Sequence, residues 1–425
     1  MPTLRRTLSN RLASGLLWNF AALIPIGIGG FLINILVARI YGPEALGVFN
    51  QVLALYLVAS QVCAGGFAFS TLRFAAMHAE SERETSAMLA TALILVSGIS
   101  VAVGLILWIV AGPAGSWLES PAVATGLRWV APGLIAFSLN KVLFAAINGM
   151  QRMRAYALGQ AARFLLLLAT LLVLIHEDAA WQLLPVLFTV GEFVLFVGLA
   201  VYLAPILRAG GRQARAGWWS RHLAFGVKAW PIGLLMDVNT KVDIVMLGYF
   251  MGDAAVGVYA FATLFVEALA QILVVVQNNL NPLFARFDAQ VREAEIRRLI
   301  RATHRRFLPW FGGIAAAIVL VFPLLVEIIV GDAAFLEARG YLGVIGLGML
   351  IAAGYLPFNM LLNQLGHPGW FSMFIGSTVI VNVILNGLLI PWLGGMGAAI
   401  ATAFAFAAQV PLLKAFVRRA TTLHI

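Results

Sequence analysis

The sequence has little charge for its length. Only 11% of its 425 residues are Asp, Glu, Lys or Arg, and 62% are hydrophobic. An ordinary soluble domain has about a quarter of its residues charged, so this few charges cannot cover a water-facing surface. The mean hydropathy is +0.94. The composition therefore excludes a soluble globular protein and indicates a chain surrounded largely by lipid.

Signatures of catalysis and of metal binding are equally scarce. Cys63 is the only cysteine, which excludes an intramolecular disulfide and a cysteine-based metal cage. The sequence has no Gly-Lys pair, and therefore no phosphate-binding P-loop, and it has neither a His-Glu-x-x-His nor a Cys-x-x-Cys motif. We therefore expect a protein that is not an enzyme and that holds no metal or resident cofactor.

What the sequence does contain is a series of apolar runs of about twenty residues, the length that crosses a hydrocarbon core of about 30 Å as a helix. Backbone groups in lipid need partners within the chain, so each run predicts a helix. The runs are 15–40, 47–72, 87–111, 128–149, 156–175, 181–205, 223–250, 255–282, 307–330, 341–362, 370–390 and 396–416. The sequence therefore predicts an all-α polytopic membrane protein of about 12 transmembrane helices.

The basic residues in and near the ends of these runs are distributed unevenly between the two sides. With the N-terminus inside, nearly all of them are counted on the inner side, among them Arg163 near the inner end of the fifth run, and only Arg39, Arg128 and Arg339 are counted on the outer side. Such an excess on one side sets the orientation of membrane proteins. It predicts that both termini are cytoplasmic. It also accounts for most of the net charge of +10 without a nucleic-acid partner.

The two halves of the chain repeat. A shift of 210 positions places 38–49 on 248–259, and the two glycines of the turn, a flanking acidic residue, a valine and an aromatic residue recur. Each repeat would hold six helices, so the halves would be parallel copies related by an axis along the membrane normal. We expect two pseudo-symmetric six-helix bundles, an N-terminal one over 1–206 and a C-terminal one over 223–425, joined by a cytoplasmic linker over 207–222.

Several ionisable residues lie inside the predicted spans, where each costs about 2.5–3.5 kcal/mol on insertion scales if it faces lipid. They must therefore point into a bundle or a hydrated cavity. The acids near mid-span are Glu192, Asp237 and Glu267, and the lysines are Lys141, Lys228 and Lys241.

Two interpretations of these charges stay open. In the first, Asp237 and Lys241 form an internal ion pair, and the other acids bind amide side chains for structural reasons. In the second, the charges line a partly hydrated cavity in which the lysines receive an anion and one acid, Asp237, Glu267 or Glu192, binds a coupling proton or sodium ion. Asparagines such as Asn34 and Asn278 would then bind hydroxyl-rich cargo in the same cavity.

A basic segment precedes the ninth span. Residues 286–306 alternate Arg and Glu at helical spacing, as in Glu293 and Arg297, which predicts a short amphipathic helix on the cytoplasmic surface. Its simplest role is a topology anchor that touches anionic lipid headgroups, and the alternative is a surface for a protein partner.

Several blocks carry a family resemblance. They are Ser14-Gly15-Leu16-Leu17-Trp18-Asn19, the block from Ala38 to Phe49 with its Ala-Arg-x-x-Gly-Pro-Glu-x-Leu-Gly pattern, Asn148-Gly149-Met150-Gln151-Arg152, and the turn from Gly252 to Tyr259. Together they resemble the Wzx-type polysaccharide-biosynthesis oligosaccharide flippases of the multidrug/oligosaccharidyl-lipid/polysaccharide exporter superfamily. The resemblance covers the whole chain in layout, and its specific motifs lie mostly in the first fifty residues.

This resemblance implies a two-bundle transporter of the bacterial inner membrane. Members move an undecaprenyl-pyrophosphate-linked sugar repeat unit to the outer leaflet, in exchange for a proton or sodium ion, and work beside a polysaccharide polymerase and chain-length machinery. Cationic cavity residues are then expected to meet the pyrophosphate. By depth and helical face this sequence offers Lys141, Lys228 and Lys241, with Arg39 and Arg73 at helix ends.

Two rival functions remain. A cation-coupled multidrug antiporter of the same superfamily would suit the acids of the spans, which are Asp237, Asp243, Glu192 and Glu267. A membrane enzyme of glycan assembly would need a larger external loop or a central intramembrane histidine, and the sequence offers neither.

Overall fold

The computed structural model describes the backbone of residues 2–208, 217–284 and 292–421, and the side chains of 27–208, 217–231, 233–281 and 293–421. Every regular element in these ranges is a helix, which confirms the predicted all-α class. Much of the predicted linker over 207–222 lies outside the described residues.

Two of the helices are long enough to hold two crossings each. α1 (Pro2–Met77) turns at Gly42, where φ is +80°, and α13 (Pro368–Ala420) turns at Gly394, where φ is +55°. Glycine takes such angles without the steric cost that a Cβ brings. Each helix therefore contains two of the predicted spans on either side of a glycine.

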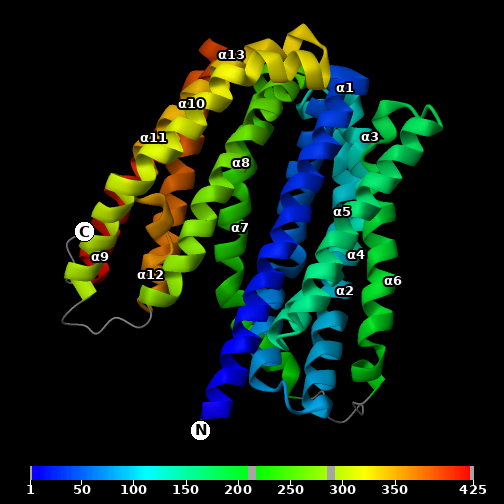
Figure 1. Ribbon diagram of the computed structural model, residues 1–425. Coiled ribbons are helices and arrows are strands. Elements are labelled where there is room, and N and C mark those ends of the chain that lie inside the picture. The colour runs from blue at the N-terminus through cyan, green and yellow to red at the C-terminus, as the bar shows by residue number, and fades with distance from the viewer. Residues whose placement is uncertain (1, 209–216, 285–291, 422–425) are drawn as a thin grey trace. The chain divides into compact units, whose positions relative to one another are not determined.

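The other helices follow the predicted spans in chain order (Figure 1). They are α2 (Glu82–Trp117), α3 (Pro121–Val130), α4 (Gly133–Gly149), α5 (Met153–His176), α6 (Val186–Arg208), α7 (Trp218–Met251), α8 (Asp253–Phe284), α9 (Arg292–Ala302), α10 (Leu308–Leu325), α11 (Ala338–Ala352) and α12 (Leu361–Gln364). The π-helical turns η3 (Thr303–Phe307) and η4 (Val326–Val330) flank α10. The amphipathic helix predicted before the ninth span is confirmed as α9.

Length and composition support the predicted number of crossings. Within the described residues, eight helices are long and apolar enough to span a membrane, or nine if α3 and α4, bent by 51°, form one broken span. That number counts α1 and α13 once each. It omits α7, which carries three charges, Asp237, Lys241 and Asp243, within the length of one crossing. The prediction of about twelve transmembrane helices is therefore confirmed.

Packing divides the chain into two compact units. Unit 1 consists of Met1–Asn34 and Val52–Leu234, and unit 2 of Ile35–Gln51 and Leu235–Ile425. The predicted bundles over 1–206 and 223–425 are defined by sequence repetition, which is a different criterion, and they stay a prediction.

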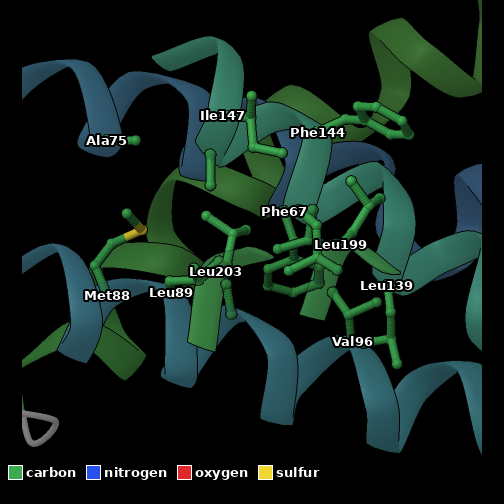
Figure 2. Packing of buried hydrophobic residues seen from close by; sticks show 14 of the residues in the cluster. Phe67, Ala75, Met88, Leu89, Val96, Leu139, Phe144, Ile147, Leu199 and Leu203 are labelled. Carbon is green, nitrogen blue, oxygen red and sulfur yellow. The ribbon is translucent and has the colours of Figure 1, made fainter. Parts of the chain in front are cut away.

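The core of unit 1 lies where α2, α4 and α6 meet (Figure 2). Leu89, Leu139 and Leu203 are buried there, together with Phe67 of α1. The start of α7 is fixed to the same core, because the buried His222 bonds Ser70 Oγ through Nδ1 at 2.7 Å and the Met88 carbonyl through Nε2 at 3.1 Å. This arrangement satisfies both ring nitrogens of a histidine that is closed off from solvent.

Unit 2 contains a reciprocal contact between the two repeated turns. A Cβ added to Gly47 would overlap the Asp253 carbonyl, and one added to Gly257 would overlap the Pro43 carbonyl. The 210-residue shift relates Pro43 to Asp253 and Gly47 to Gly257. The glycine of each turn therefore packs against the residue that is equivalent to position 43 in the other turn, as in a contact across a twofold axis. Gln51 Nε2 also donates to Asp253 Oδ1 at 2.6 Å. Glycine is needed at 47 and 257 because the backbones touch.

Candidate functional site

The polar centre of unit 1 is built around Glu192 of α6, whose side chain is 2% exposed. Arg163 Nε lies 2.9 Å from Glu192 Oε1. Asn140 of α4 donates through Nδ2 to Glu192 Oε2 at 2.8 Å and to the Glu192 carbonyl at 2.9 Å. A buried carboxylate needs such partners, since an uncompensated charge in the interior is strongly unfavourable. Three helices are joined at this point.

Arg163 corrects the sequence analysis, which counted it with the inner-side charges. It lies inside α5, and its guanidinium is 5.1 Å from the ring centre of Phe137 and 5.0 Å from that of Phe144. The arginines at the start of α5 made an inner-side position plausible. The structure instead makes Arg163 the counter-ion of Glu192, with its guanidinium next to two aromatic rings.

Lys141 lies next to this pair on α4. Its Nζ donates to Ser60 Oγ at 2.7 Å and is 5.0 Å from the centre of the Phe137 ring. Tyr56 stacks on the Phe137 ring, with the two ring centres 5.0 Å apart and an angle of 16° between the planes. Phe137 thus lies close to the cations of both Lys141 and Arg163.

The other predicted residues of unit 1 lie on α1 and α7. Asn34 Nδ2 donates to the Gly30 carbonyl of its own helix at 2.9 Å. The Arg73 guanidinium is 5.1 Å from the ring centre of Phe225. Lys228 is exposed on α7. These contacts place them apart from the centre formed by Glu192 and its partners.

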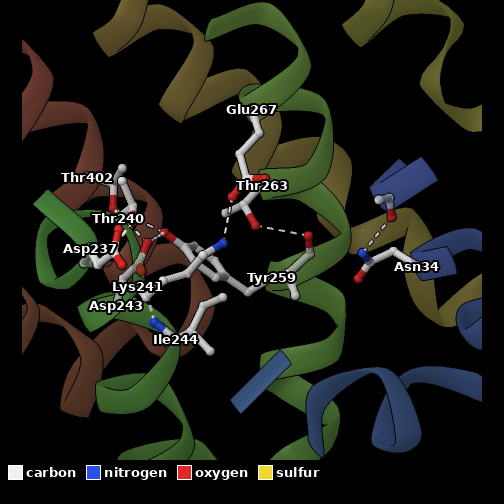
Figure 3. A network of polar contacts seen from close by, with 12 residues as sticks. Asn34, Asp237, Thr240, Lys241, Asp243, Ile244, Tyr259, Thr263, Glu267 and Thr402 are labelled. Carbon is white, nitrogen blue, oxygen red and sulfur yellow. Dashed lines mark hydrogen bonds and ion pairs between the residues drawn. The ribbon is translucent and has the colours of Figure 1, made fainter. Parts of the chain in front are cut away.

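The charged centre of unit 2 pairs Lys241 with Glu267 (Figure 3). Lys241 Nζ lies 2.7 Å from Glu267 Oε1, and the Glu267 side chain is 54% exposed. Of the two open interpretations, the internal pair of Asp237 with Lys241 is therefore not the contact formed. Asp237 lies one turn away, and its carbonyl accepts a hydrogen bond from Thr240 Oγ1 at 3.0 Å.

Asp243 is a second acid of unit 2, and it has a different environment (Figure 3). It is 5% exposed. Tyr259 donates its hydroxyl to Asp243 Oδ2 at 2.6 Å, and the Ile244 amide donates to Oδ1 at 2.9 Å. Thr402 Oγ1 lies 3.5 Å from the same Oδ2 and 3.1 Å from the Tyr259 hydroxyl. α7, α8 and α13 thus each contribute one oxygen-bearing side chain.

The sequence analysis counted Asp243 among the acids of the spans without assigning the coupling ion to it, and it did not select Tyr259 or Thr402. None of the four ion pairs among the described residues includes Asp243. One signal was available, because the repeat places Phe49 on Tyr259, so only the second half carries a hydroxyl at this position. A buried carboxylate surrounded by hydroxyl groups either holds a proton or binds a cation through oxygen ligands.

Two other predicted residues of unit 2, Arg39 and Asn278, are not part of the contacts of Glu267 or Asp243. Arg39 NH1 donates to the Ile329 carbonyl at 3.4 Å, at the start of the kinked turn of α1. Asn278 is exposed near the end of α8. The structure therefore gathers only part of the predicted set, Lys241 and Glu267, into one contact.

A comparison with protein families shows which family the chain belongs to. A family model described as "Polysaccharide biosynthesis protein" matches residues 12–288. No curated protein matches the sequence.

Solved transporter structures share the fold at low sequence identity. A lipid II flippase, MurJ, in an inward closed conformation has a TM-score of 0.73 and 15% identity, over 95% of this chain and 87% of that chain. An inward-facing multidrug resistance MATE family transporter of the MOP superfamily has a TM-score of 0.72 and 14% identity, over 95% and 98%. A Vibrio cholerae MATE transporter, VcmN, has a TM-score of 0.67 and 14% identity, over 97% of both chains.

Proposed function

The chain belongs to the polysaccharide biosynthesis protein family, and from this membership we propose that it flips lipid-linked oligosaccharides across a bacterial inner membrane. The cargo is an oligosaccharide repeat unit on an undecaprenyl diphosphate, moved from the inner to the outer leaflet for synthesis of cell-surface polysaccharide. The family match over 12–288 carries the proposal, and the fold shared with a lipid II flippase supports it. Both termini are cytoplasmic in this proposal, and the polysaccharide polymerase and chain-length machinery receive the product.

The cargo diphosphate is assigned to the cationic side chains of the spans. Lys141 is the best supported, because Ser60 and Phe137 hold its ammonium at a fixed place on α4. An ammonium attracts a diphosphate more strongly in a low-dielectric site than in water. The remaining proposed cargo residues are Lys228, Lys241, Arg39, Arg73, Asn34 and Asn278.

The coupling ion, a proton or sodium, is assigned to Asp243. Glu192 and Glu267 each have a basic partner within 3 Å, whereas Asp243 is bound by hydroxyl and amide groups. A cation that binds one conformation better than the other shifts the equilibrium between them, which is the step that alternating access needs. Asp237 stays the second choice, on the same helix.

The test uses purified protein in proteoliposomes with a fluorescent undecaprenyl-diphosphate oligosaccharide, whose leaflet is read by quenching from outside. Wild type is expected to move the label across the bilayer and to do so faster under an imposed proton or sodium gradient. Asp243→Asn is expected to retain transport down the cargo gradient and to lose the response to the ion gradient.

Asp237→Asn is the matched control, because it removes a charge from the same helix. It is expected to keep the response to the ion gradient. Loss of the response in Asp237→Asn and its retention in Asp243→Asn would transfer the ion site to Asp237. Absence of label movement in wild type would refute the flippase proposal itself.

A cation-coupled multidrug antiporter is the second candidate, supported by the fold shared with MATE transporters over 98% of one such chain. It predicts efflux of a cationic dye such as ethidium from loaded vesicles under an ion gradient. Dye efflux without movement of the lipid-linked label would replace the first proposal by this one.

A further inference from the structure

The hydroxyl network around Asp243 lies close to one end of unit 2. Asp243 stands about two helical turns before α7 ends at Met251, and Tyr259 stands nearly two turns after the start of α8. Thr402 stands about two turns after the turn of α13 at Gly394, and a Cβ added to Gly394 would lie 2.9 Å from the Met251 side chain. At 5.4 Å per turn, the three helices place the network about 11 Å from this end. In the proposed orientation it is the outer end, so an ion reaches Asp243 by the shorter way from outside.

Tyr341 of α11 lies between the network and the outer turn of α13. Its ring centre is 6.1 Å from that of Tyr259, with an angle of 48° between the planes. A Cβ added to Gly395 would overlap the Tyr341 hydroxyl, so this hydroxyl lies at the level of the turn. The Tyr259 hydroxyl lies 3.1 Å from Thr402 Oγ1, about two turns deeper along the same helix. The side chain of Tyr341 therefore extends from the Tyr259 ring to the outer turn.

Glu337 holds the Tyr341 side chain from the surface. It is the last residue of the 3-10 turn η5 (Ala333–Glu337), and its Oε1 accepts a hydrogen bond from the Tyr341 hydroxyl. Glu337 is exposed, whereas Tyr341 is 4% exposed. Side chains that carry oxygen thus follow one another from the surface inward, in the order Glu337, Tyr341, Tyr259 and Asp243. A cation on this route meets oxygen atoms, which it binds in preference to apolar groups.

The packing of these side chains closes the route in this structure. Asp243 is 5% exposed and Tyr259 is 0% exposed. Protein interiors are packed without gaps of atomic size, so an ion passes Tyr341 only when its ring moves. The bond that holds the ring ends on an exposed carboxylate, where water replaces a broken hydrogen bond at little net cost. The Tyr341 side chain can therefore open and close during transport.

We propose that Tyr341 is the outer gate of the Asp243 ion site and that Glu337 holds this gate closed. The proposal rests on the proposed function, which assigns the coupling ion to Asp243. When the bond to Glu337 breaks and the ring turns away, the ion reaches Asp243 from the outer side. The competing route passes Thr402, whose side chain is half-buried.

The experiment measures how fast a cysteine at the ion site reacts with a cationic, membrane-impermeant thiol reagent, methanethiosulfonate ethyltrimethylammonium. The reagent is applied to right-side-out membrane vesicles, and mass spectrometry of the purified full chain reads the modification. The reporter is Asp243→Cys in a Cys63→Ser chain, because Cys63 is the only native cysteine. Tyr341→Ala removes the ring and is expected to raise the rate at least roughly tenfold, since the packed ring is the barrier. Tyr341→Phe keeps the ring without its bond to Glu337 and is expected to raise the rate roughly fivefold.

The matched control removes another aromatic ring from unit 2. Tyr355 follows the opposite end of α11, and its ring packs against His304 with ring centres 5.2 Å apart. Tyr355→Ala is expected to leave the rate at Asp243→Cys unchanged. An increase as large as that of Tyr341→Ala would show general loosening of unit 2 and would overturn the gate. Thr402→Cys is the second reporter, used where Asp243→Cys does not fold, and the same increase in Tyr341→Ala is expected there.

The outcomes separate the gate from the function. Equal rates with and without the Tyr341 ring would overturn the gate, and fast modification of Thr402→Cys in every chain would put the route past Thr402 instead. Either result leaves the flippase proposal standing, because the reaction needs neither cargo nor an ion gradient. Wild type that moves no lipid-linked label would overturn the proposed function, and with it the role of the gate, without altering these rates.

Discussion

The two units each contain a buried carboxylate, and the two carboxylates are bound in different ways. In unit 1, Glu192 is neutralised by Arg163 and fixed by Asn140. In unit 2, Asp243 is bound by the Tyr259 hydroxyl and the Ile244 amide. A carboxylate paired with a guanidinium has its charge compensated permanently, whereas one held by hydroxyl groups can exchange a proton or a cation. The difference is consistent with a structural role for Glu192 and supports the proposed ion site at Asp243.

This difference exists although the halves repeat. The 210-residue shift places Glu192 on Thr402 and Ile33 on Asp243, so neither acid has an acidic counterpart in the other half. The turns at Gly42 and Gly252, in contrast, have nearly equal φ values of 80° and 83°. The duplicated chain thus retained its backbone turns while its polar interior diverged, as expected if one half specialises in the ion and the other in the cargo.

The largest effect is expected from Arg163→Met, which leaves Glu192 buried without a counter-ion. Removing one partner of a buried pair typically costs about 3–5 kcal/mol. The midpoint of thermal unfolding in detergent, followed by the exposure of Cys63 to a thiol dye, measures the loss. Arg163→Met with Glu192→Gln is the control and is expected to recover most of the stability. A single variant as stable as wild type would contradict the structural role of the pair.

The second-largest effect is expected at the two repeated turns, which stayed alike in both halves. Gly47→Ala and Gly257→Ala each place a Cβ against a backbone carbonyl, and overpacking of this kind costs about 1–3 kcal/mol. Because the contact is reciprocal, the two losses of thermal stability should be similar. Gly98→Ala, at an open helical position, is the control and should be neutral or slightly stabilising. Tolerance at one glycine and not at the other would show that the reciprocal contact does not exist.

A third prediction compares two buried tyrosines. Tyr259→Phe removes a hydrogen bond to Asp243 and is expected to change the proton or sodium concentration for half-maximal stimulation of transport by roughly tenfold. Tyr56→Phe is the control in unit 1, because the buried Tyr56 hydroxyl has no hydrogen-bond partner among the described residues. Equal ion dependence in wild type and Tyr259→Phe would separate the tyrosine from the ion site.

The fold was accessible from the sequence because its signal is long and repetitive. Apolar runs and the distribution of basic residues predicted the spans, and the repeated glycines predicted the sharp turns at Gly42 and Gly252, whose positive φ angles the structure confirms. α1 and α13 each contain two predicted spans, and in each helix a glycine, Gly42 or Gly394, lies at the turn between them. α7 was found as the apolar run 223–250, although its charges keep it from the helices that length and composition alone recognise as spans.

The site was harder to predict, because the sequence shows how deep in a span a side chain lies but not which side chains of other helices it contacts. Lys241 was placed on one helical face with Asp237 from their spacing of four residues, yet its ammonium contacts Glu267 of the next helix. Arg163 was assigned to the inner surface, and only the packing of α5 on α6 shows that it faces Glu192. Thr402 carries no charge, so nothing in its own position indicated that it meets Asp243. These roles depend on contacts between helices, which cannot be predicted from the spacing of residues along one helix.

The smallest effect is expected from Lys241→Gln, although its ammonium lies 2.7 Å from the Glu267 carboxylate. Its partner Glu267 is 54% exposed, so the carboxylate remains solvated when the lysine is lost. Pairs in such surroundings contribute at most about 1 kcal/mol, and they are screened by salt. We therefore expect a small decrease in the thermal midpoint at low ionic strength that disappears at high salt. Lys241→Glu with Glu267→Lys should restore the midpoint. A loss as large as that of Arg163→Met would mean that Glu267 is as closed off from water as Glu192, and the contrast between the two units would fail.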